Sequence, residues 1–435
     1  DGFEIVVDGR ERAPAAASAD MYLDRAGRAL ARLSLDSALA AAIPGTPAAM
    51  AHIGKKYGRL PLSTTLSPAV CLAREGFVVT ERYQKMIERR LPALADSPAA
   101  SAVFLPDGLA PEPGYRVRQP ELAETLEHIV ANGEQGFYAG ATAARLVEGV
   151  RAAGGIWTLD DLADYRLVER APLRGEYRGM RITTVPPPSA GGTALIQMLK
   201  ILEPYPLDKL ARVERERLLI ETMRLAYRDR AEYMGDPDFV NVDVERLLSA
   251  GHIKQQRARL GTRGIKPAIT GAPRAAGANT THFSVIDREG NRVAATLTLN
   301  THFGSGFMPP GTGVLLNNEM DDFVVKPGAA NTYGLVGSAA NAIAPGKRPL
   351  SSMMPTFLET PDLVVALGTP GGSRIISMML LAGLEVAAGR GDARAWINRP
   401  RFHHQYLPDE VEYEPAAFDA RAARRLANLG YKLKR

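Results

Sequence analysis

Two threonines, Thr280 and Thr298, lie in runs that a β-hairpin would bring together. The runs TTHFSVID and RVAATLTLN have the composition of strands, and residues 288–290 join them with a glycine where a left-handed residue is needed. If Asp287 pairs with Asn291, Thr280 faces Thr298, because directly opposed residues share one face of a sheet. The spacing therefore predicts that two hydroxyl groups meet across the hairpin.

A threonine that begins a chain carries its own base. Cleavage of the Asn279–Thr280 bond would leave Thr280 with a free α-amine beside its hydroxyl, and that amine can take the hydroxyl proton at neutral pH. Residues 257–279, directly upstream, are rich in Gly, Pro, Ala and Arg without periodicity, which is typical of an exposed flexible loop. The alternative is that threonine is simply a good strand former.

Two other stretches carry groups suited to binding or catalysis. In NNEMDDF, Glu319 and Asp322 are three positions apart, so a helical turn would present both carboxylates together to a cation. A solvated acidic turn or a loose calcium loop would have the same pattern.

The run LVVALGTPGGSRI predicts a buried strand, a glycine turn at Gly371 and Gly372, and a helix. Backbone N–H groups at such a turn suit a developing oxyanion, although a plain tight turn also explains two glycines.

Elements of several kinds must position these groups. From about residue 20 to 260 the patterns are mostly helical, as in ERYQKMIERRLPALA and RERLLIETMRLAYRDRAEYMG. The segment YRGMRITTVPPPSAGGTALIQMLKILE predicts a strand, a Pro/Gly loop and a buried helix. After Thr280 the pattern changes to short β-rich runs, THFSVID, RVAATLTLN, GVLLNN and LVVALG, followed by a helix in SRIISMMLLAGLEVAAG.

Composition excludes several classes of function. The chain has 435 residues, 46% of them hydrophobic, and its net charge of +5 is spread without a basic block, so nucleic acid is not an expected partner. No apolar run is long enough to span a membrane. Cys71 is the only cysteine, which excludes an internal disulfide and predicts a small buried residue. Adjacent His403 and His404 would point to opposite faces of a strand, so we expect no metal there.

The two ends of the sequence have the character of interrupted elements. It opens at DGFEIVVDGRERAP without an initiator methionine and closes at LANLGYKLKR, where a strand begins. We therefore interpret the sequence as part of a longer precursor.

Several long motifs resemble one family. TTHFSVID, TLNTHFGSG, LLNNEMDDF, RPLSSMMPT and GTPGGSRI resemble the small subunit of the γ-glutamyltranspeptidases, which are N-terminal nucleophile hydrolases, and RERAP, IPGTP, PPPSAGG and GDPDFV resemble their large subunit. The resemblance covers nearly the whole chain in order. It implies an α+β fold, a four-layer αββα sandwich, made as one precursor that cleaves itself. Residues 1–279 would then be the large-subunit segment and 280–435 the catalytic small-subunit segment.

The resemblance implies a role for each matching residue at the reaction centre. Thr280 would attack the Asn279–Thr280 bond during maturation and act as the catalytic nucleophile afterwards. Thr298 matches a second threonine that hydrogen-bonds and orients the nucleophile. Gly371 and Gly372 match the oxyanion hole.

The resemblance also implies how the donor would be held. Arg10, Ser351 and Ser352 match residues that bind the α-carboxylate of the glutamyl group; without the resemblance we would expect a surface arginine and a serine turn. Tyr333, in the segment 326–337, matches the aromatic residue of a lid loop.

The ammonium end of the donor has its own matching residues. Asn300, Glu319 and Asp322 match the groups that contact the α-ammonium. The first acidic position is Gln or Glu within the family, so Glu319 lies within the pattern.

These matches imply a γ-glutamyl acyltransferase and hydrolase that acts on glutathione and other γ-glutamyl amides, passes the acyl group to water, amino acids or dipeptides, and needs no cofactor. The two segments would remain together as a heterodimer, periplasmic or secreted. A glutaryl-cephalosporin acylase on the same scaffold is the alternative enzyme. A binding protein on this scaffold, or an inactive fragment, is the non-enzymatic alternative, and loss of Thr280 would have been expected of a binding protein.

Overall fold

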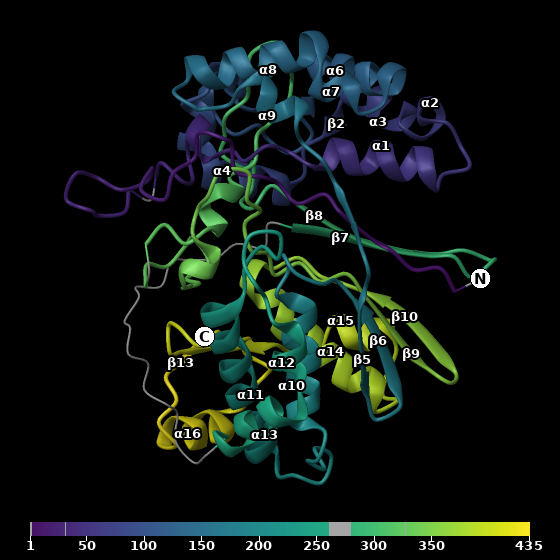
Figure 1. Ribbon diagram of the computed structural model, residues 1–435, viewed down its shortest axis with the longest axis vertical. Coiled ribbons are helices and arrows are strands. Elements are labelled where there is room, and N and C mark those ends of the chain that lie inside the picture. The colour runs from purple at the N-terminus through teal and green to yellow at the C-terminus, as the bar shows by residue number, and fades with distance from the viewer. Residues whose placement is uncertain (1, 31, 261–279, 327) are drawn as a thin grey trace.

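The computed structural model describes residues 2–30, 32–260, 280–326 and 328–435. In Figure 1 the early helices gather at one end of the molecule and the later helices at the other, with the hairpin β7–β8 between them. The early helices are α1 (Thr46–Lys56), α2 (Leu62–Thr65), α3 (Ser67–Glu75), α4 (Glu81–Ala95), α5 (Pro98–Phe104), α6 (Pro120–Asn132), α7 (Gln135–Tyr138), α8 (Gly140–Ala152) and α9 (Leu159–Ala163). The later helices are α10 (Gly191–Leu202), α11 (Arg212–Tyr233), α12 (Val244–Leu248), α13 (Ala250–Ala258), α14 (Ile375–Ala387), α15 (Ala393–Ile397) and α16 (Ala420–Asn428).

The central sheet joins strands from both halves of the sequence. Its order is β10 (Leu363–Leu367), β9 (Thr356–Thr360), β6 (Met180–Thr184) and β5 (Leu173–Tyr177), all antiparallel. Because β6 pairs with β9, the segment before Thr280 and the segment after it share one hydrogen-bonded ladder. Smaller sheets lie outside this one. Two are pairs, β1 (Val6–Asp8) with β4 (Val168–Arg170) and β2 (Phe77–Val78) with β3 (Arg116–Val117), and one has three strands in the order β11 (Phe402–His403), β12 (Val411–Tyr413) and β13 (Leu433–Lys434).

Helices cover one face of this sheet. The apolar helix α10 is almost wholly buried, and with α11 and α14 it forms the largest hydrophobic core together with residues of β5, β6 and β9. Leu358 of β9 points into this core, whereas its neighbour Glu359 points to the other face, as alternation along a strand requires. Burial of this apolar surface is the main source of stability for such a layered fold.

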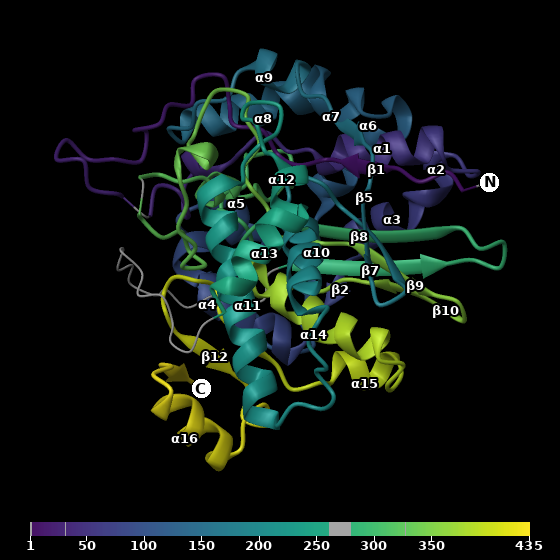
Figure 2. The ribbon, with the colours of Figure 1, turned by 60° about the horizontal axis from the view of Figure 1, so that its bottom comes forward.

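The hairpin forms a second β layer on that other face. It consists of β7 (Thr280–Ile286) and β8 (Arg292–Thr298), and its Arg292 Nη1 donates to Glu359 Oε1 of the sheet at 2.5 Å. Both hairpin strands contact β10, and Figure 2 shows the hairpin alongside β9 and β10. Helices, sheet and hairpin therefore lie in successive layers, which agrees with the predicted α+β class.

The predicted register of the hairpin is confirmed. Thr280 pairs with Thr298 and Val285 with Val293, and the Asp287 N–H donates to the Asn291 carbonyl at 3.0 Å. Gly290 has a φ of +84°, the left-handed conformation expected for the turn. The helices predicted in the runs that became α4, α11 and α14 are confirmed, as is the strand, loop and buried helix of β6 and α10.

Three local predictions are wrong or lie outside the described residues. GVLLNN, residues 313–318, forms no strand: Leu316 is buried in a core built mostly from helical residues, so the apolar run fills this core from a loop. Cys71 is exposed, because α3 buries Ala73 and the two positions lie about half a helical turn apart. Of the predicted loop 257–279, the first residues end α13 and residues 261–279 lie outside the described part of the chain.

We predict that Gly192→Ala destabilises the fold. Gly192 opens α10 against the preceding strand, and a Cβ there would lie 2.2 Å from the Val185 carbonyl oxygen. Because backbone cannot yield as a flexible side chain does, we expect a loss of about 1 to 3 kcal/mol in the free energy of unfolding. The control is Gly251→Ala in α13, where nothing lies within 4 Å and a small gain is expected. Equal unfolding midpoints for the two variants in urea would contradict this prediction.

Candidate active site

One pocket gathers residues that are far apart in the sequence. It lies beside the open end of the hairpin, where β7 begins and β8 ends. The residues lining it are Arg10, Arg230, Thr280, Thr298, Asn300, Glu319, Asp322, Tyr333, Leu335, Ser351, Ser352, Met353, Gly372, Ser373 and Ile375. All the predicted site residues are present except Gly371, which precedes Gly372 in the chain, and Asn279, which lies outside the described residues. The fold thus brings the predicted residues together.

The two threonine hydroxyl groups meet at the mouth of the hairpin. Thr280 Oγ1 donates to Thr298 Oγ1 at 3.4 Å, and Thr298 Oγ1 also accepts a 2.9 Å hydrogen bond from the Asn300 N–H. Asn300 leaves the strand with a φ of +71°, a conformation that asparagine tolerates better than most residues. This turn directs the end of β8 into the pocket, so that Thr298 is held from one side by the backbone while it contacts Thr280 on the other.

An arginine joins the two predicted carboxylates. The segment Glu319–Asp322 is a 3₁₀ turn, as the predicted helical turn requires, and Arg10 donates to Glu319 Oε2 and to Asp322 Oδ2, each at 2.6 Å. Glu319 is fully buried, so the acidic turn is not a solvated one. The cation that compensates these carboxylates in the structure is the guanidinium of Arg10.

Charge is not balanced around that guanidinium. Burial opposes the charge on Arg10, but Glu319, Asp322 and Glu11 together outweigh it and raise the pKa of Arg10 above its usual value. Burial also raises the pKa of Glu319 well above its ordinary value; Arg10 opposes this shift, and Glu11 and Asp322 add to it. Three carboxyl groups therefore surround Arg10, and Arg230, which interacts electrostatically with Asp322, is a second cation in the same pocket.

Buried polar atoms without partners concentrate in this pocket. Among the described residues, Asn300 Oδ1 and Glu319 Oε1 are buried acceptors that receive no hydrogen bond. The pocket also contains three buried donors that make no hydrogen bond: Arg230 Nε, Ser352 Oγ and Ser373 Oγ. A buried polar atom left unsatisfied costs about 1 to 3 kcal/mol. Acceptors and donors side by side therefore suit a ligand with a positive and a negative group.

The glycine turn at the end of β10 presents free backbone N–H groups. Gly371 has a φ of +143° and Gly372 a φ of +55°. Within the described chain no group accepts a hydrogen bond from either amide. A Cβ on Gly372 would lie 2.4 Å from the ring of Tyr333, so this position admits only glycine while the tyrosine is in place. Such unused N–H groups next to a hydroxyl are what an oxyanion site needs.

Tyr333 forms one wall of the pocket and is held there by a network of buried hydrogen bonds. Its hydroxyl donates to the Asn300 carbonyl at 2.5 Å, and its own carbonyl accepts from Gln405 Nε2 at 3.0 Å. His403 connects Gln405 Oε1, at 2.9 Å, with Ser377 Oγ of α14, at 2.8 Å. Burial lowers the pKa of His403 to about 4, so the ring is neutral at pH 7. The network ties the tyrosine to the helix that follows the glycine turn.

His403 and His404 have separate partners. His404 Nε2 contacts Asp409 Oδ1 at 3.1 Å, away from the Ser377 and Gln405 contacts of His403. The two imidazole rings thus have different hydrogen-bond partners, and their joint absence from a metal site stays a prediction. No cluster of at least three His, Cys, Asp or Glu side chains suited to a metal occurs in the described residues.

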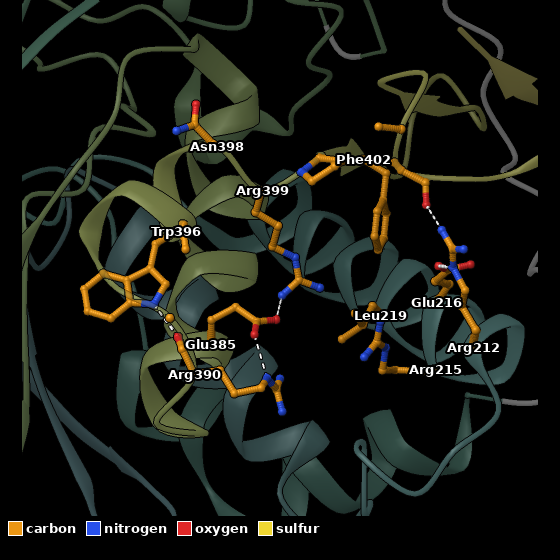
Figure 3. Close-up of a pocket in the computed structure, with 15 residues that line it drawn as sticks. Arg212, Arg215, Glu216, Leu219, Glu385, Arg390, Trp396, Asn398, Arg399 and Phe402 are labelled. Carbon is orange, nitrogen blue, oxygen red and sulfur yellow. Dashed lines mark hydrogen bonds and ion pairs between the residues drawn. The ribbon is translucent and has the colours of Figure 1, made fainter.

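A second pocket, between α11, α14 and α15, has a different chemical character. Its lining contains no Ser, Thr, Cys, Tyr or His. Figure 3 shows Glu385 between Arg390 and Arg399, and Arg212 with Glu216, so most of its arginines are already paired. Its two carboxylates, Glu216 and Glu385, are paired with these arginines, and the pocket lacks the hydroxyl groups and the glycine turn found beside the hairpin.

Sequence reasoning missed Arg230 and Ser373 at the candidate site. Ser373 follows the predicted glycines directly, and the strand, glycine turn and helix pattern was the signal that pointed to it. Arg230 is one of several arginines on α11, and no local pattern distinguishes it from the others.

Comparison with known proteins decides the family. The sequence model described as γ-glutamyltranspeptidase matches residues 1–435. The chain belongs to this family. A glutathione hydrolase proenzyme from Pseudomonas sp. (strain A14) is 41% identical over 99% of this chain and 76% of its own length. Cephalosporin acylase from Bacillus halodurans superposes with a TM-score of 0.81 at 28% identity, over 98% of this chain and 77% of that one.

A second structure supports the same fold. The γ-glutamyltranspeptidase of Helicobacter pylori is 35% identical, with a TM-score of 0.58 over 61% of this chain and 77% of that one. The fold is therefore the N-terminal nucleophile hydrolase fold that the sequence motifs indicated. No helix among the described residues is long and apolar enough to cross a membrane.

We predict that Thr298→Val slows turnover without unfolding the protein. Valine keeps the shape of threonine and its strand preference but loses the hydrogen bond to Thr280, which is worth about 1 to 3 kcal/mol, or roughly 5- to 150-fold in kcat/KM. The control is Thr296→Val, two residues earlier on β8, whose hydroxyl contacts His282 outside the pocket. Steady-state assays should show a loss for the first variant only; equal rates would contradict the role of Thr298.

Proposed function

We propose that the protein is a γ-glutamyl acyltransferase and hydrolase that cleaves glutathione and other γ-glutamyl amides. The observation that supports this most directly is the set of unpartnered donors and acceptors beside Thr280, which suits the zwitterionic head of a glutamyl group. The relatives named as glutathione hydrolase proenzymes agree with it.

The reaction runs through the hydroxyl of Thr280. Its Oγ1 attacks the γ-carbonyl carbon of the donor, while the α-amine of the same residue accepts the hydroxyl proton. The oxygen of the tetrahedral intermediate accepts hydrogen bonds from the N–H groups of Gly371 and Gly372. The amide C–N bond breaks, the proton passes to the leaving amine, and a γ-glutamyl ester remains on Thr280. Water or the amine of an amino acid or dipeptide then takes the acyl group.

The donor's head group binds at the other end of the pocket. Asn300, Glu319 and Asp322 hold the α-ammonium, with the free Asn300 Oδ1 and Glu319 Oε1 as its acceptors. Arg10, Ser351 and Ser352 hold the α-carboxylate. These two sets lie next to each other, as Arg10 contacts both acidic residues. An α-amino acid requires this, because its ammonium and carboxylate share one carbon. Tyr333 covers the bound donor.

Maturation would divide the chain into two segments that stay together. Cleavage of the Asn279–Thr280 bond separates residues 1–279 from 280–435 and frees the amine of Thr280. The β6–β9 ladder and the contacts of Arg10 cross this division, which supports a heterodimer. In keeping with the resemblance, we place the enzyme in the periplasm or outside the cell.

A glutaryl-cephalosporin acylase is the second candidate, because acylases occur among the related structures and sequences. A glutaryl donor lacks the α-ammonium. The buried acceptors Asn300 Oδ1 and Glu319 Oε1, which receive no hydrogen bond from the described residues, favour a donor that has it.

We predict that Thr280→Ala gives a single uncleaved chain without activity, because one hydroxyl serves both maturation and turnover. Thr280→Ser should retain part of both. The control is Thr281→Ala, since the neighbouring side chain is exposed. Intact mass and N-terminal sequencing of the purified protein provide the measurement. Normal cleavage of the Thr280→Ala variant would rule out the assigned nucleophile.

We predict that the enzyme prefers γ-glutamyl-p-nitroanilide to glutaryl-p-nitroanilide by on the order of a hundredfold or more in kcat/KM. The two compounds differ only in the α-amino group, and a donor without it leaves the buried acceptors Asn300 Oδ1 and Glu319 Oε1 without a hydrogen bond. Asp322→Ala should narrow this ratio, because it lowers kcat/KM for the γ-glutamyl compound more than for the glutaryl compound. Asp321→Asn, on the same turn but in contact with Ser34, is the control. Equal turnover of both compounds by the unmodified enzyme would favour the acylase.

A further inference from the structure

Arg230 is a buried cation at the wall of the active-site pocket. It lies near the end of α11, the residue is 6% exposed, and it lines the pocket together with Thr280 and Ser352. Within the described residues its guanidinium makes no hydrogen bond or ion pair, and its Nε is buried without a partner. On the same helix, Arg224 and Arg228 do have acidic partners, Glu221 and Asp229.

The surroundings of Arg230 call for an anion. Burial lowers the pKa of Arg230, Asp322 acts in the opposite direction, and the positive charge of Arg10 adds to the lowering. Guanidinium groups remain charged at neutral pH even so. A buried charge with no partner is strongly unfavourable, and a negative group of a ligand would relieve it.

Arg10 has little capacity left for such an anion. A guanidinium has five N–H donors. In this structure Arg10 Nε donates to the Pro349 carbonyl, Nη1 to Glu319 and Glu11, and Nη2 to Asp322. One N–H of Arg10 remains, whereas every N–H of Arg230 is free of described partners. A planar carboxylate can therefore form a bidentate pair with Arg230 without displacing an existing contact.

We propose that Arg230 is a second guanidinium ligand for the α-carboxylate of the donor and a determinant of specificity for it. The inference rests on the proposed function, because it concerns the same bound donor. Arg10 then holds the acidic turn in place as well as reaching the carboxylate, and Arg230, with the free hydroxyl of Ser352, supplies most of the hydrogen bonds to that group. A role limited to balancing the charge of Asp322 is the competing explanation.

The test compares donors that lack one charged group each. The substrates are γ-glutamyl-p-nitroanilide, 4-aminobutyryl-p-nitroanilide, which lacks the α-carboxylate, and glutaryl-p-nitroanilide, which lacks the α-ammonium. For Arg230→Met we expect kcat/KM for the γ-glutamyl compound to fall at least tenfold, mainly through KM, while the aminobutyryl compound changes less than about twofold. Arg230→Lys should keep part of the preference for the γ-glutamyl over the aminobutyryl compound. Because each ratio is taken within one sample, a lower folded fraction cancels out.

Arg224→Met is the matched control. It removes a buried arginine from the same helix, outside the pocket, and should leave both substrate ratios unchanged. A binding measurement is independent of turnover: glutamate should raise the melting temperature of the unmodified protein more than 4-aminobutyrate does, and Arg230→Met should remove this difference.

Two results would overturn the proposal. Arg230→Met could keep the full preference for the γ-glutamyl over the aminobutyryl compound, or it could alter only the preference over the glutaryl compound, which would assign Arg230 to balancing Asp322. Failure of the unmodified enzyme to cleave the γ-glutamyl compound would refute the proposed function itself, and is thus distinguishable from either result.

Discussion

The buried ion pairs of Arg10 with Glu319 and Asp322 hold the candidate site together. They connect a residue near the start of the chain with a turn more than three hundred positions later, at 2.6 Å on each side. Each pair stabilises both of its charges, since an unpaired buried ion is strongly destabilising. The turn that carries both carboxylates is therefore fixed relative to the pocket, and with it the free acceptor atoms that face the ligand.

Backbone hydrogen bonds also connect the segment before Thr280 with the segment after it. Strands β6 and β9 lie on either side of the proposed cleavage point and form the middle of the central sheet. The hairpin that begins at Thr280 rests on that sheet through the ion pair of Arg292 and Glu359. A break before Thr280 would therefore free an amine at the reaction centre without loosening the layers that position it.

On the other side of the pocket, Tyr333 packs directly against the glycine turn. Tyr333 occupies the space that a side chain on Gly372 would need, and the network through Gln405, His403 and Ser377 ties it to α14. The backbone N–H groups at the glycine turn and the covering ring thus share one rigid arrangement. The buried histidine serves here as a neutral structural hydrogen-bonding group, because its pKa of about 4 keeps it uncharged at neutral pH.

The sequence by itself determined the features that depend on near neighbours or on long matching motifs. The hairpin register follows from turn length and strand alternation, so Thr280 and Thr298 could be paired without a structure. The carboxylates of Glu319 and Asp322 could be placed on one turn by their spacing. Only the tertiary structure decided that Arg10 binds both of them, that Arg230 faces the pocket without a partner, that Cys71 is exposed and that GVLLNN is a buried loop. These depend on which surfaces of distant elements meet, and local composition does not encode that information: an apolar run can fill a core as a strand or a loop, and an arginine on a helix is paired or free according to what packs against it.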